Sequence, residues 1–162
     1  YAKRQSAKAF EKQSLDVKEI IEGIIPLVRS ELNLDHIQLR VNIPPRTMVC
    51  ADRRSLEEIF INLIVNACQA MPNGGEIEIS AKEEKPWLTL RVRDTGPGLS
   101  PEQLEHIFEP FYTTKASGTG LGLYVIRKII EDTHKGKIAF SSEHGKGTTF
   151  VIDLPLYTDR NS

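Results

Sequence analysis

The chain has 162 residues, 40% of them hydrophobic and 27% charged, which is typical of one folded globular domain and excludes wholesale disorder. Its 21 basic and 22 acidic residues nearly cancel, so we expect no nucleic-acid partner, because such a partner requires a dense basic surface. No apolar stretch approaches the roughly 20 residues of a membrane span, so we expect no membrane contact by this domain. The two cysteines lack the spacing of a metal site, and buried reduced thiols of a cytoplasmic protein are the simplest interpretation. The first residue is Tyr1 and not methionine, which suggests a fragment of a longer protein, either soluble or membrane-anchored.

The N-terminal part is predicted to contain a polar lead, a helix and a strand. Residues 1–13 are rich in Lys, Gln and Ala, and we expect them to end a preceding linker or dimerisation helix. Apolar residues at helical spacing over 17–32 predict a helix with Ser14 as its N-cap and a kink at Pro26. Residues 36–43 alternate between polar and apolar side chains, which predicts a strand.

The rest of the chain is predicted to alternate between helices and antiparallel strands. Asp52 is expected to cap a long helix that ends near Met71, before a Pro-Asn-Gly-Gly turn. Alternation and capping signals then predict strands over 76–81, 87–94, 137–142 and 148–154, and shorter helices beginning after Ser100 and at Gly122. This order predicts an α+β two-layer sandwich, with helices on one face of a mixed, mostly antiparallel sheet. We expect the domain to cover residues 14–156 and residues 157–162 to form a loose tail.

The long helix carries a polar stripe on an otherwise apolar surface. Apolar residues of 56–71 cover almost the whole helical wheel and predict burial nearly all round, and the narrow gap holds Glu58, Asn62, Asn66 and Gln69. Buried polar groups cost about 1–3 kcal/mol each unless they are hydrogen-bonded or bind a ligand. Two interpretations remain open. The stripe faces water or bonds to neighbouring backbone, or it lines a polar cavity where amide oxygens complete the shell of a cation such as Mg²⁺.

The strand predicted over 87–94 ends on an aspartate with the parity of its apolar residues. Asp94 follows Leu88, Leu90 and Val92 on the same face, so its carboxylate is expected to point toward the core and to need donors. In the turn that follows, glycines allow the backbone to approach a ligand closely. Asp94 either bonds to its own loop or accepts a hydrogen bond from a ligand amine, such as the amino group of adenine.

A glycine-rich loop precedes the last predicted helix. The segment Gly118-Thr119-Gly120-Leu121-Gly122 would present backbone N–H groups and the positive end of a helix dipole, a suitable site for phosphate. A helix cap or a plain hinge is the alternative interpretation. The loop does not match the dinucleotide fingerprint, and the G-x-x-x-x-G-K-[ST] pattern of a P-loop is absent from the sequence.

Four stretches, in order, resemble the sequence boxes of the histidine-kinase catalytic domain. They are the N box (Asn62-Leu63-Ile64-Val65-Asn66-Ala67), the first glycine box (Asp94-Thr95-Gly96-Pro97-Gly98), the F box (Phe108-Glu109-Pro110-Phe111) and the second glycine box (Gly118 to Leu123). The similarity runs over about residues 52–154, and the segment around Lys115 is similar to nitrogen-regulation and PAS-linked kinases with short ATP lids. The resemblance implies the Bergerat ATP-binding fold shared with gyrase, Hsp90 and mismatch-repair ATPases.

The resemblance also implies roles for individual residues. Asp94 would contact the adenine amine, Gly96 and Gly98 would shape the adenine pocket, and Thr148 would reach adenine through water. The residues implied at the phosphates are Asn66 as the Mg²⁺ ligand, Asn62 beside the phosphates, and the loop of Gly118, Thr119, Gly120, Leu121 and Gly122. For Lys115, chemistry more than the match suggests a lid cation near the γ-phosphate.

Position 62 discriminates between members of this superfamily. Members that hydrolyse ATP or phosphorylate serine carry a Glu base four residues before the metal-binding Asn, whereas this chain has Asn62, which cannot take a proton. Glu58 lies one turn further along, about 5–6 Å away on a helix surface, which is too far to replace that base. This pattern favours a histidine kinase, because a neutral imidazole is already a good nucleophile.

The expected function is therefore the binding of Mg-ATP and the donation of its γ-phosphate to a histidine in two-component signalling. None of the four histidines is followed by an acidic residue and a later proline, so the acceptor is expected on a dimerisation hairpin before residue 1. The expected partners are this helical hairpin and the receiver domain of a response regulator. The alternative is a stand-alone Bergerat-fold ATPase or nucleotide-dependent switch.

One departure from the family pattern is His134-Lys135-Gly136 in place of His-Gly-Gly, and we interpret His134 as structural.

Overall fold

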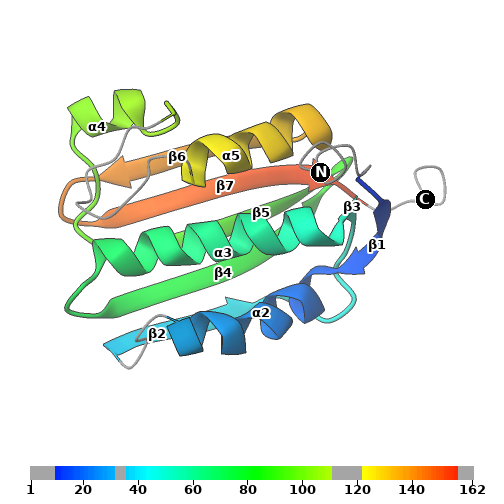
Figure 1. Cartoon of the computed structure of the whole chain (residues 1–162), viewed down its shortest axis with the longest axis horizontal. Helices are drawn as coiled ribbons and strands as arrows, with labels where there is room; N and C mark the ends of the chain where they lie inside the picture. The colour runs from blue at the N-terminus through cyan, green and yellow to red at the C-terminus, as the bar shows by residue number, and fades with distance from the viewer. Residues whose placement is uncertain (1–9, 32–35, 111–121, 157–162) are drawn as a thin grey trace, which may run out of the picture.

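The computed structural model describes residues 10–31, 36–110 and 122–156 (Figure 1). The strands are β1 (Lys12–Asp16), β2 (Ile37–Asn42), β3 (Met48–Asp52), β4 (Gly75–Glu84), β5 (Trp87–Asp94), β6 (Lys137–Glu143) and β7 (Gly147–Pro155). The helices are α2 (Val17–Glu31), α3 (Arg53–Ala70), α4 (Pro101–His106) and α5 (Gly122–Lys128), and α5 continues into the π-helical turn η2 (Ile129–Thr133).

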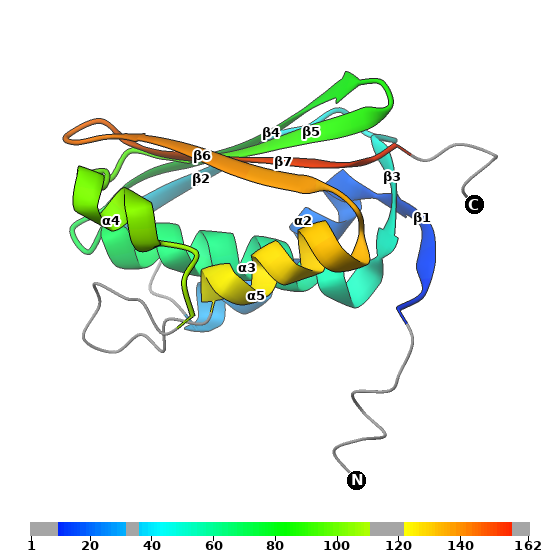
Figure 2. The same ribbon diagram turned by 90° about the horizontal axis from the view of Figure 1, so that it is seen from above.

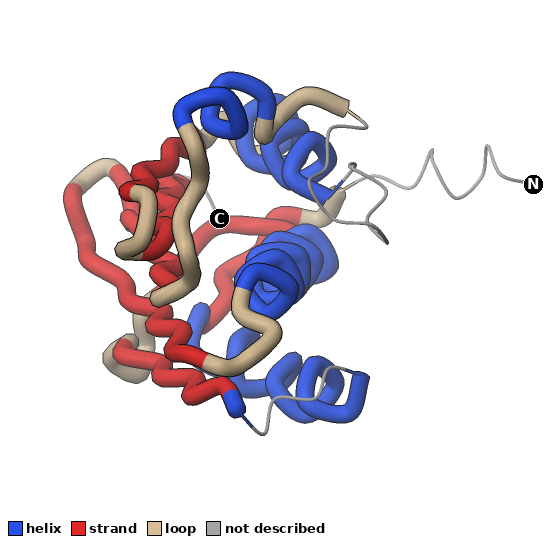
Figure 3. Tube along the Cα trace, turned by 90° about the vertical axis from the view of Figure 1, so that its left-hand side faces the viewer, coloured by secondary structure: helices blue, strands red, loops and turns tan. Residues whose placement is uncertain are grey.

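Two layers make up the domain. Five strands form one sheet in the order β2-β4-β5-β7-β6, in which β2 and β4 are parallel and the other pairs antiparallel. The helices lie together on one face of this sheet, as Figure 2 shows from above and Figure 3 shows end-on. The predicted α+β two-layer sandwich is therefore confirmed.

The hydrophobic core lies between the helices and the sheet. Phe60, Leu63 and Ile64 of α3 are buried and share one cluster with strand residues such as Leu90 and Ile152. Burying a side chain of this size contributes about 1.5–3 kcal/mol, so the cluster anchors α3 against the sheet. The predicted burial of α3 nearly all round is only partly correct, because its flanking apolar residues Ile61 and Val65 are half-buried.

The N-terminal boundary differs from the prediction. Lys12 and Gln13, expected to end a helix, lie in β1, which pairs antiparallel with β3 in a separate two-stranded sheet. The N-cap of α2 is Asp16 and not Ser14, because the Asp16 carboxylate accepts hydrogen bonds from the backbone N–H groups of Lys18 (3.0 Å) and Glu19 (3.3 Å). The helix runs through Pro26. Residues 1–9 lie outside the described part of the chain.

Strand β3, which the sequence did not predict, leads directly into α3. The side chain of Asp52, the last residue of β3, accepts from the backbone N–H of Ser55 at 3.0 Å, so the predicted N-cap of α3 is confirmed. The hairpin of β4 and β5, the capping box at Ser100 and the strands β6 and β7 also appear as predicted. Both cysteines are buried, and burial raises the pKa of the Cys68 thiol to about 11, which keeps it neutral. Within the described ranges, no helix is long and apolar enough for a membrane span.

Candidate functional site

Strand β5 ends on a buried carboxylate, at the start of a glycine turn. Asp94 is 6% exposed, and its Oδ1 accepts from the backbone N–H of Gly96 at 2.9 Å and from that of Thr148 at 3.3 Å. The first bond stays within the turn, so the interpretation of Asp94 as a residue bonded to its own loop holds for this oxygen. The second bond comes from β7, so the carboxylate also joins the turn to another strand. Its predicted core-facing position is confirmed.

The β6–β7 hairpin holds this turn from the side. Ser142 Oγ accepts from the backbone N–H of Leu99 at 2.7 Å and lies 2.9 Å from the hydroxyl of Thr148. The backbone N–H of Gly145 donates to the carbonyl of Pro97 at 2.6 Å. Thr148 therefore lies beside Asp94. Ser142 was not singled out, because a serine in an alternating strand gives no signal of this contact in the sequence.

Two glycines of the turn are required by the packing of the protein itself. Gly98 has φ +75°, and a Cβ there would meet the carbonyl of Glu143. A Cβ at Gly96 would lie 3.0 Å from Asp94 Oδ1 and 3.2 Å from Met71 Cγ. These contacts give a packing reason for glycine at both positions, besides the close approach to a ligand that the sequence suggested.

Only part of the polar stripe of α3 is sheltered. Asn62 and Asn66 are half-buried, while Glu58 and Gln69 are exposed. The Asn62 amide donates to the carbonyl of Glu58 at 2.8 Å, so for this residue the interpretation of a bond to neighbouring backbone is correct. The oxygen of the same amide points toward the start of α5, because a Cβ at Gly122 would lie 3.2 Å from it. Gly122, the first residue of α5, therefore lies close to Asn62 of the N box.

The other predicted loop residues, namely Lys115, Gly118, Thr119, Gly120 and Leu121, lie outside the described part of the chain.

Residues of α4, of the segment after it and of α5 border a groove. Phe108 packs against Phe140, with ring centroids 5.3 Å apart, and the guanidinium of Arg127 lies 5.3 Å from the centroid of the Phe108 ring. A groove of about 520 Å³ lies between α4 and α5 and is bordered by Phe108, Arg127 and Tyr124. Glu109, which also borders the groove, accepts a hydrogen bond from Nδ1 of His106 at 2.9 Å, and this bond raises the pKa of His106. Phe108 of the F box therefore packs the segment after α4 against β6 and β7 of the sheet.

The candidate metal ligand is a neutral amide. In the described ranges, no three His, Cys, Asp or Glu side chains cluster to hold a metal ion. Mg²⁺ commonly binds through one or two protein oxygens together with substrate phosphates, so a cage of carboxylates is not required. Asn66 lies on α3 one turn before Ala70, and a Cβ at Gly96 would lie 3.6 Å from the Ala70 Cβ. An amide oxygen such as that of Asn66 is a ligand type that Mg²⁺ accepts together with nucleotide phosphates.

Comparisons with known proteins match this arrangement. The family described as histidine kinase-, DNA gyrase B- and HSP90-like ATPase matches residues 51–158. The nucleotide-free catalytic domain of histidine kinase ThkA superposes with a TM-score of 0.81 at 33% identity, over 90% of this chain and 96% of that one. The chain belongs to the histidine kinase catalytic domains of this ATPase family. Its fold is accordingly the ATP-binding fold of that family.

Longer histidine kinases contain a region similar to this catalytic domain. Sporulation kinase E of Bacillus subtilis (strain 168) is 39% identical over 145 residues, which are 86% of this chain and 19% of the relative. The sensor histidine kinase ZraS of Escherichia coli (strain K12) is 38% identical over 149 residues, or 91% of this chain and 32% of the relative. A structure of ThkA in complex with the response regulator TrrA matches at 28% identity with a TM-score of 0.78, over 96% of this chain and 45% of that one. The chain thus spans less than a third of the length of each of these two curated relatives.

Proposed function

We propose that this catalytic domain binds Mg-ATP between the turn after β5 and the C-terminal half of α3, and donates the γ-phosphate to a histidine on a helical hairpin. The observation that carries the proposal is the position of Asp94. It is a buried carboxylate in a glycine turn, joined to Thr148 and packed over the end of the helix that bears Asn62 and Asn66. We infer that the domain covers residues 14–156 together with the rest of β1.

The turn after β5 would select adenine. A carboxylate accepts hydrogen bonds, and the 6-amino group of adenine is a donor, whereas guanine carries a carbonyl at that position. Asp94 is oriented by two backbone donors, so little conformational freedom is lost when a base binds. Thr148 would take part through its hydroxyl, which already bonds to Ser142.

The N box would hold the phosphates. We infer that Asn66 supplies an amide oxygen to Mg²⁺, which when bound neutralises charge on the phosphate oxygens. Asn62 would lie beside the phosphates, next to Gly122 at the start of α5. The loop from Gly118 to Leu121 would donate backbone N–H groups to phosphate, and Lys115 would place a cation near the γ-phosphate.

Asn62 makes transfer to an external nucleophile the reaction that fits best. An amide cannot activate water, and Glu58 is exposed and contributes its backbone carbonyl to Asn62. A neutral histidine needs no such base. Its ring nitrogen forms the new P–N bond as the bond from the γ-phosphorus to the bridging oxygen breaks, ADP keeps that electron pair, and the ring proton passes to solvent.

The proposed partners are the chain's own dimerisation hairpin and the receiver domain of a response regulator. The second partner is supported by the ThkA–TrrA complex among the matching structures. Because ATP is a cytoplasmic nucleotide, we place the domain in the cytoplasm.

Radiolabelled ATP tests this function. The isolated chain should bind Mg-ATP and turn it over very slowly. Addition of the parent protein's own helical hairpin should yield an acid-labile, base-stable phosphate on histidine. Robust hydrolysis by the isolated chain, unchanged by the hairpin, would establish the alternative of a stand-alone ATPase or switch.

A further inference from the structure

The side chain of Met71 lies between Gly75, the first residue of β4, and Gly96, in the turn after β5. Met71 follows the last residue of α3 and is 4% exposed. A Cβ at Gly75 would lie 2.5 Å from the Met71 sulfur, and a Cβ at Gly96 would lie 3.2 Å from its Cγ. An unbranched thioether can fill such an irregular space, so the Met71 side chain packs against the turn after β5.

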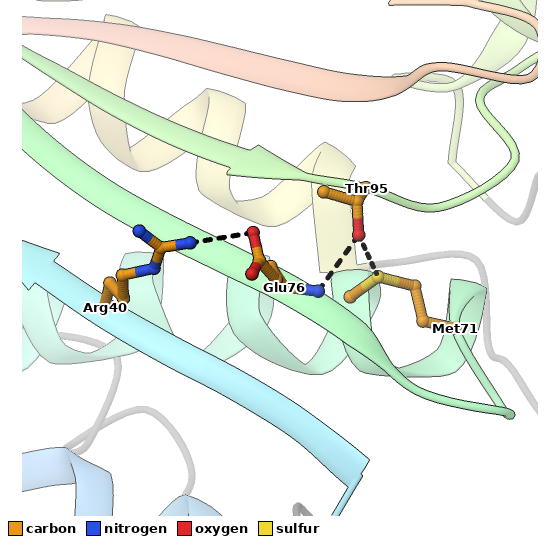
Figure 4. A network of polar contacts seen from close by, with 4 residues as sticks. All are labelled: Arg40, Met71, Glu76 and Thr95. Atoms are coloured by element: carbon orange, nitrogen blue, oxygen red, sulfur yellow. Dashed lines mark hydrogen bonds and ion pairs between the residues drawn. The ribbon is translucent and has the colours of Figure 1, made fainter.

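The hydroxyl of Thr95 connects Met71 to strand β4 of the sheet (Figure 4). Thr95 Oγ1 accepts from the backbone N–H of Glu76 at 2.9 Å and donates to the Met71 sulfur at 3.7 Å. The backbone N–H of Thr95 donates to the carbonyl of Glu76 at 3.1 Å, which closes the pair. On the other side, the Glu76 carboxylate forms an ion pair with Arg40 of β2 at 2.9 Å.

The contact between Thr95 and Met71 joins the two halves of the site. Thr95 directly follows Asp94, the proposed adenine ligand, and Met71 ends the helix that bears Asn66, the proposed metal ligand. The sulfur and hydroxyl therefore connect the base-binding turn to the phosphate-binding helix at the point where the two elements meet. A shift of the turn by a fraction of an ångström would move Asp94 relative to Asn66.

We propose that Thr95 and Met71 are positioning residues that set the Asp94 turn at the distance from α3 that adenine nucleotides require. This inference rests on the proposed function. Neither side chain needs to touch the nucleotide. The hydroxyl acts by restraining the backbone between Asp94 and Gly96, and the thioether acts by supporting Gly96 from below.

The test compares two threonines of the same strand region. Thr95→Val keeps the shape of the side chain and removes the hydroxyl, while Thr95→Ser keeps the hydroxyl. Thr89→Val is the matched control, because Thr89 is a buried residue of β5 whose hydroxyl bonds to Asp153 at 2.6 Å, away from the turn. Calorimetric titration with Mg-ATP and thermal unfolding are measured for each variant.

We expect Thr95→Val to weaken Mg-ATP binding about three- to tenfold, the value of one hydrogen bond, and Thr95→Ser to bind within about twofold of the parent chain. Thr89→Val should lower the melting temperature and leave the affinity unchanged. Met71→Leu should weaken binding as well, and the double variant with Thr95→Val should lose less than the two single losses combined, because both changes break one contact.

The outcomes separate the two proposals. If the parent chain does not bind Mg-ATP, the proposed function is wrong. If the parent chain binds and Thr95→Val binds equally well, the positioning role is wrong and the function stands. Equal losses for Thr95→Val and Thr89→Val, no rescue by serine, or full additivity in the double variant would also overturn the positioning role.

Discussion

The Nε2 atom of His134 accepts a hydrogen bond from the backbone N–H of Asp52 at 3.1 Å, while its Nδ1 donates to the carbonyl of Ile129 at 3.0 Å. One imidazole, 1% exposed, therefore joins the N-cap of α3 to the π-helical turn that ends α5. Phe10 lies against the same ring, with centroids 6.5 Å apart. The interpretation of His134 as structural agrees with these contacts, which lie at the opposite end of α3 from the Asp94 turn.

Burial lowers the pKa of His134 below its ordinary value of 6.5, so the folded protein keeps it neutral. The unfolded chain takes up a proton at a higher pH than the folded one, so stability should fall as the pH drops below about 6.5. Urea unfolding at pH 7.5 and pH 5.5 measures this change. His134→Gln should destabilise the domain by about 1–2 kcal/mol at pH 7.5 and flatten the pH dependence. His144→Gln, at an exposed position, should do neither, and an unchanged slope in His134→Gln would contradict the assignment.

Asp94→Asn should weaken ATP binding by about 2 kcal/mol, or about 30-fold, because it removes the charge-assisted hydrogen bond that the carboxylate would accept from the adenine amine. The asparagine oxygen can still accept from Gly96 and Thr148, so the fold should persist. GTP should bind the parent chain poorly. Calorimetry that finds equal affinities for ATP and GTP would exclude the adenine assignment.

Asn66→Ala should remove most of the magnesium dependence of ATP binding, because it deletes the proposed amide ligand. Titrations with and without Mg²⁺ measure this dependence. Gln69→Ala, at an exposed position on the next turn of α3, is the matched control and should leave it intact. Asn62→Ala should lower affinity less than Asn66→Ala. A loss of circular dichroism in Asn66→Ala comparable to that of a core deletion would instead indicate a structural role.

Lys115→Ala should reduce the rate of phosphoryl transfer to the hairpin more than it reduces ATP affinity. The reason is that a cation near the γ-phosphate stabilises charge that develops in the transition state. Transfer rates at saturating ATP, together with dissociation constants, separate these two effects. Lys146→Ala, at an exposed position of the β6–β7 turn, serves as the control for loss of a surface charge. An affinity loss as large as the rate loss would show that Lys115 contributes to ground-state binding alone.

Lys135→Gly should stabilise the domain by about 0.5–1 kcal/mol. Lys135 has φ +55°, a backbone conformation that costs a residue with a Cβ about 1–2 kcal/mol, part of which glycine loses again through its greater unfolded-state entropy. Lys135→Ala keeps the Cβ and should give no such gain. Chemical denaturation of both variants measures the difference, and equal stabilities would remove the backbone explanation.

Local signals in the sequence were sufficient to predict most of the helices and strands. The Asp52 cap, the capping box at Ser100 and the alternating strands depend on hydrogen bonds and side-chain patterns within a few residues, so the order of residues contains them. The core-facing position of Asp94 followed from strand parity for the same reason. The ordered motifs then identified the family, because each box keeps its own residues together in the chain.

Only the tertiary structure decided what pairs across long separations. Strand β1 exists because β3 lies beside it, which is why residues 12–16 showed no strand pattern of their own. The contacts of Ser142 with the Asp94 turn, of Met71 with Gly96 and of His134 with Asp52 join residues from elements far apart in sequence. Such contacts depend on side-chain packing and on the need of buried polar groups for hydrogen-bond partners. Which groups are packed together or buried is determined only once the helices and the sheet have assembled.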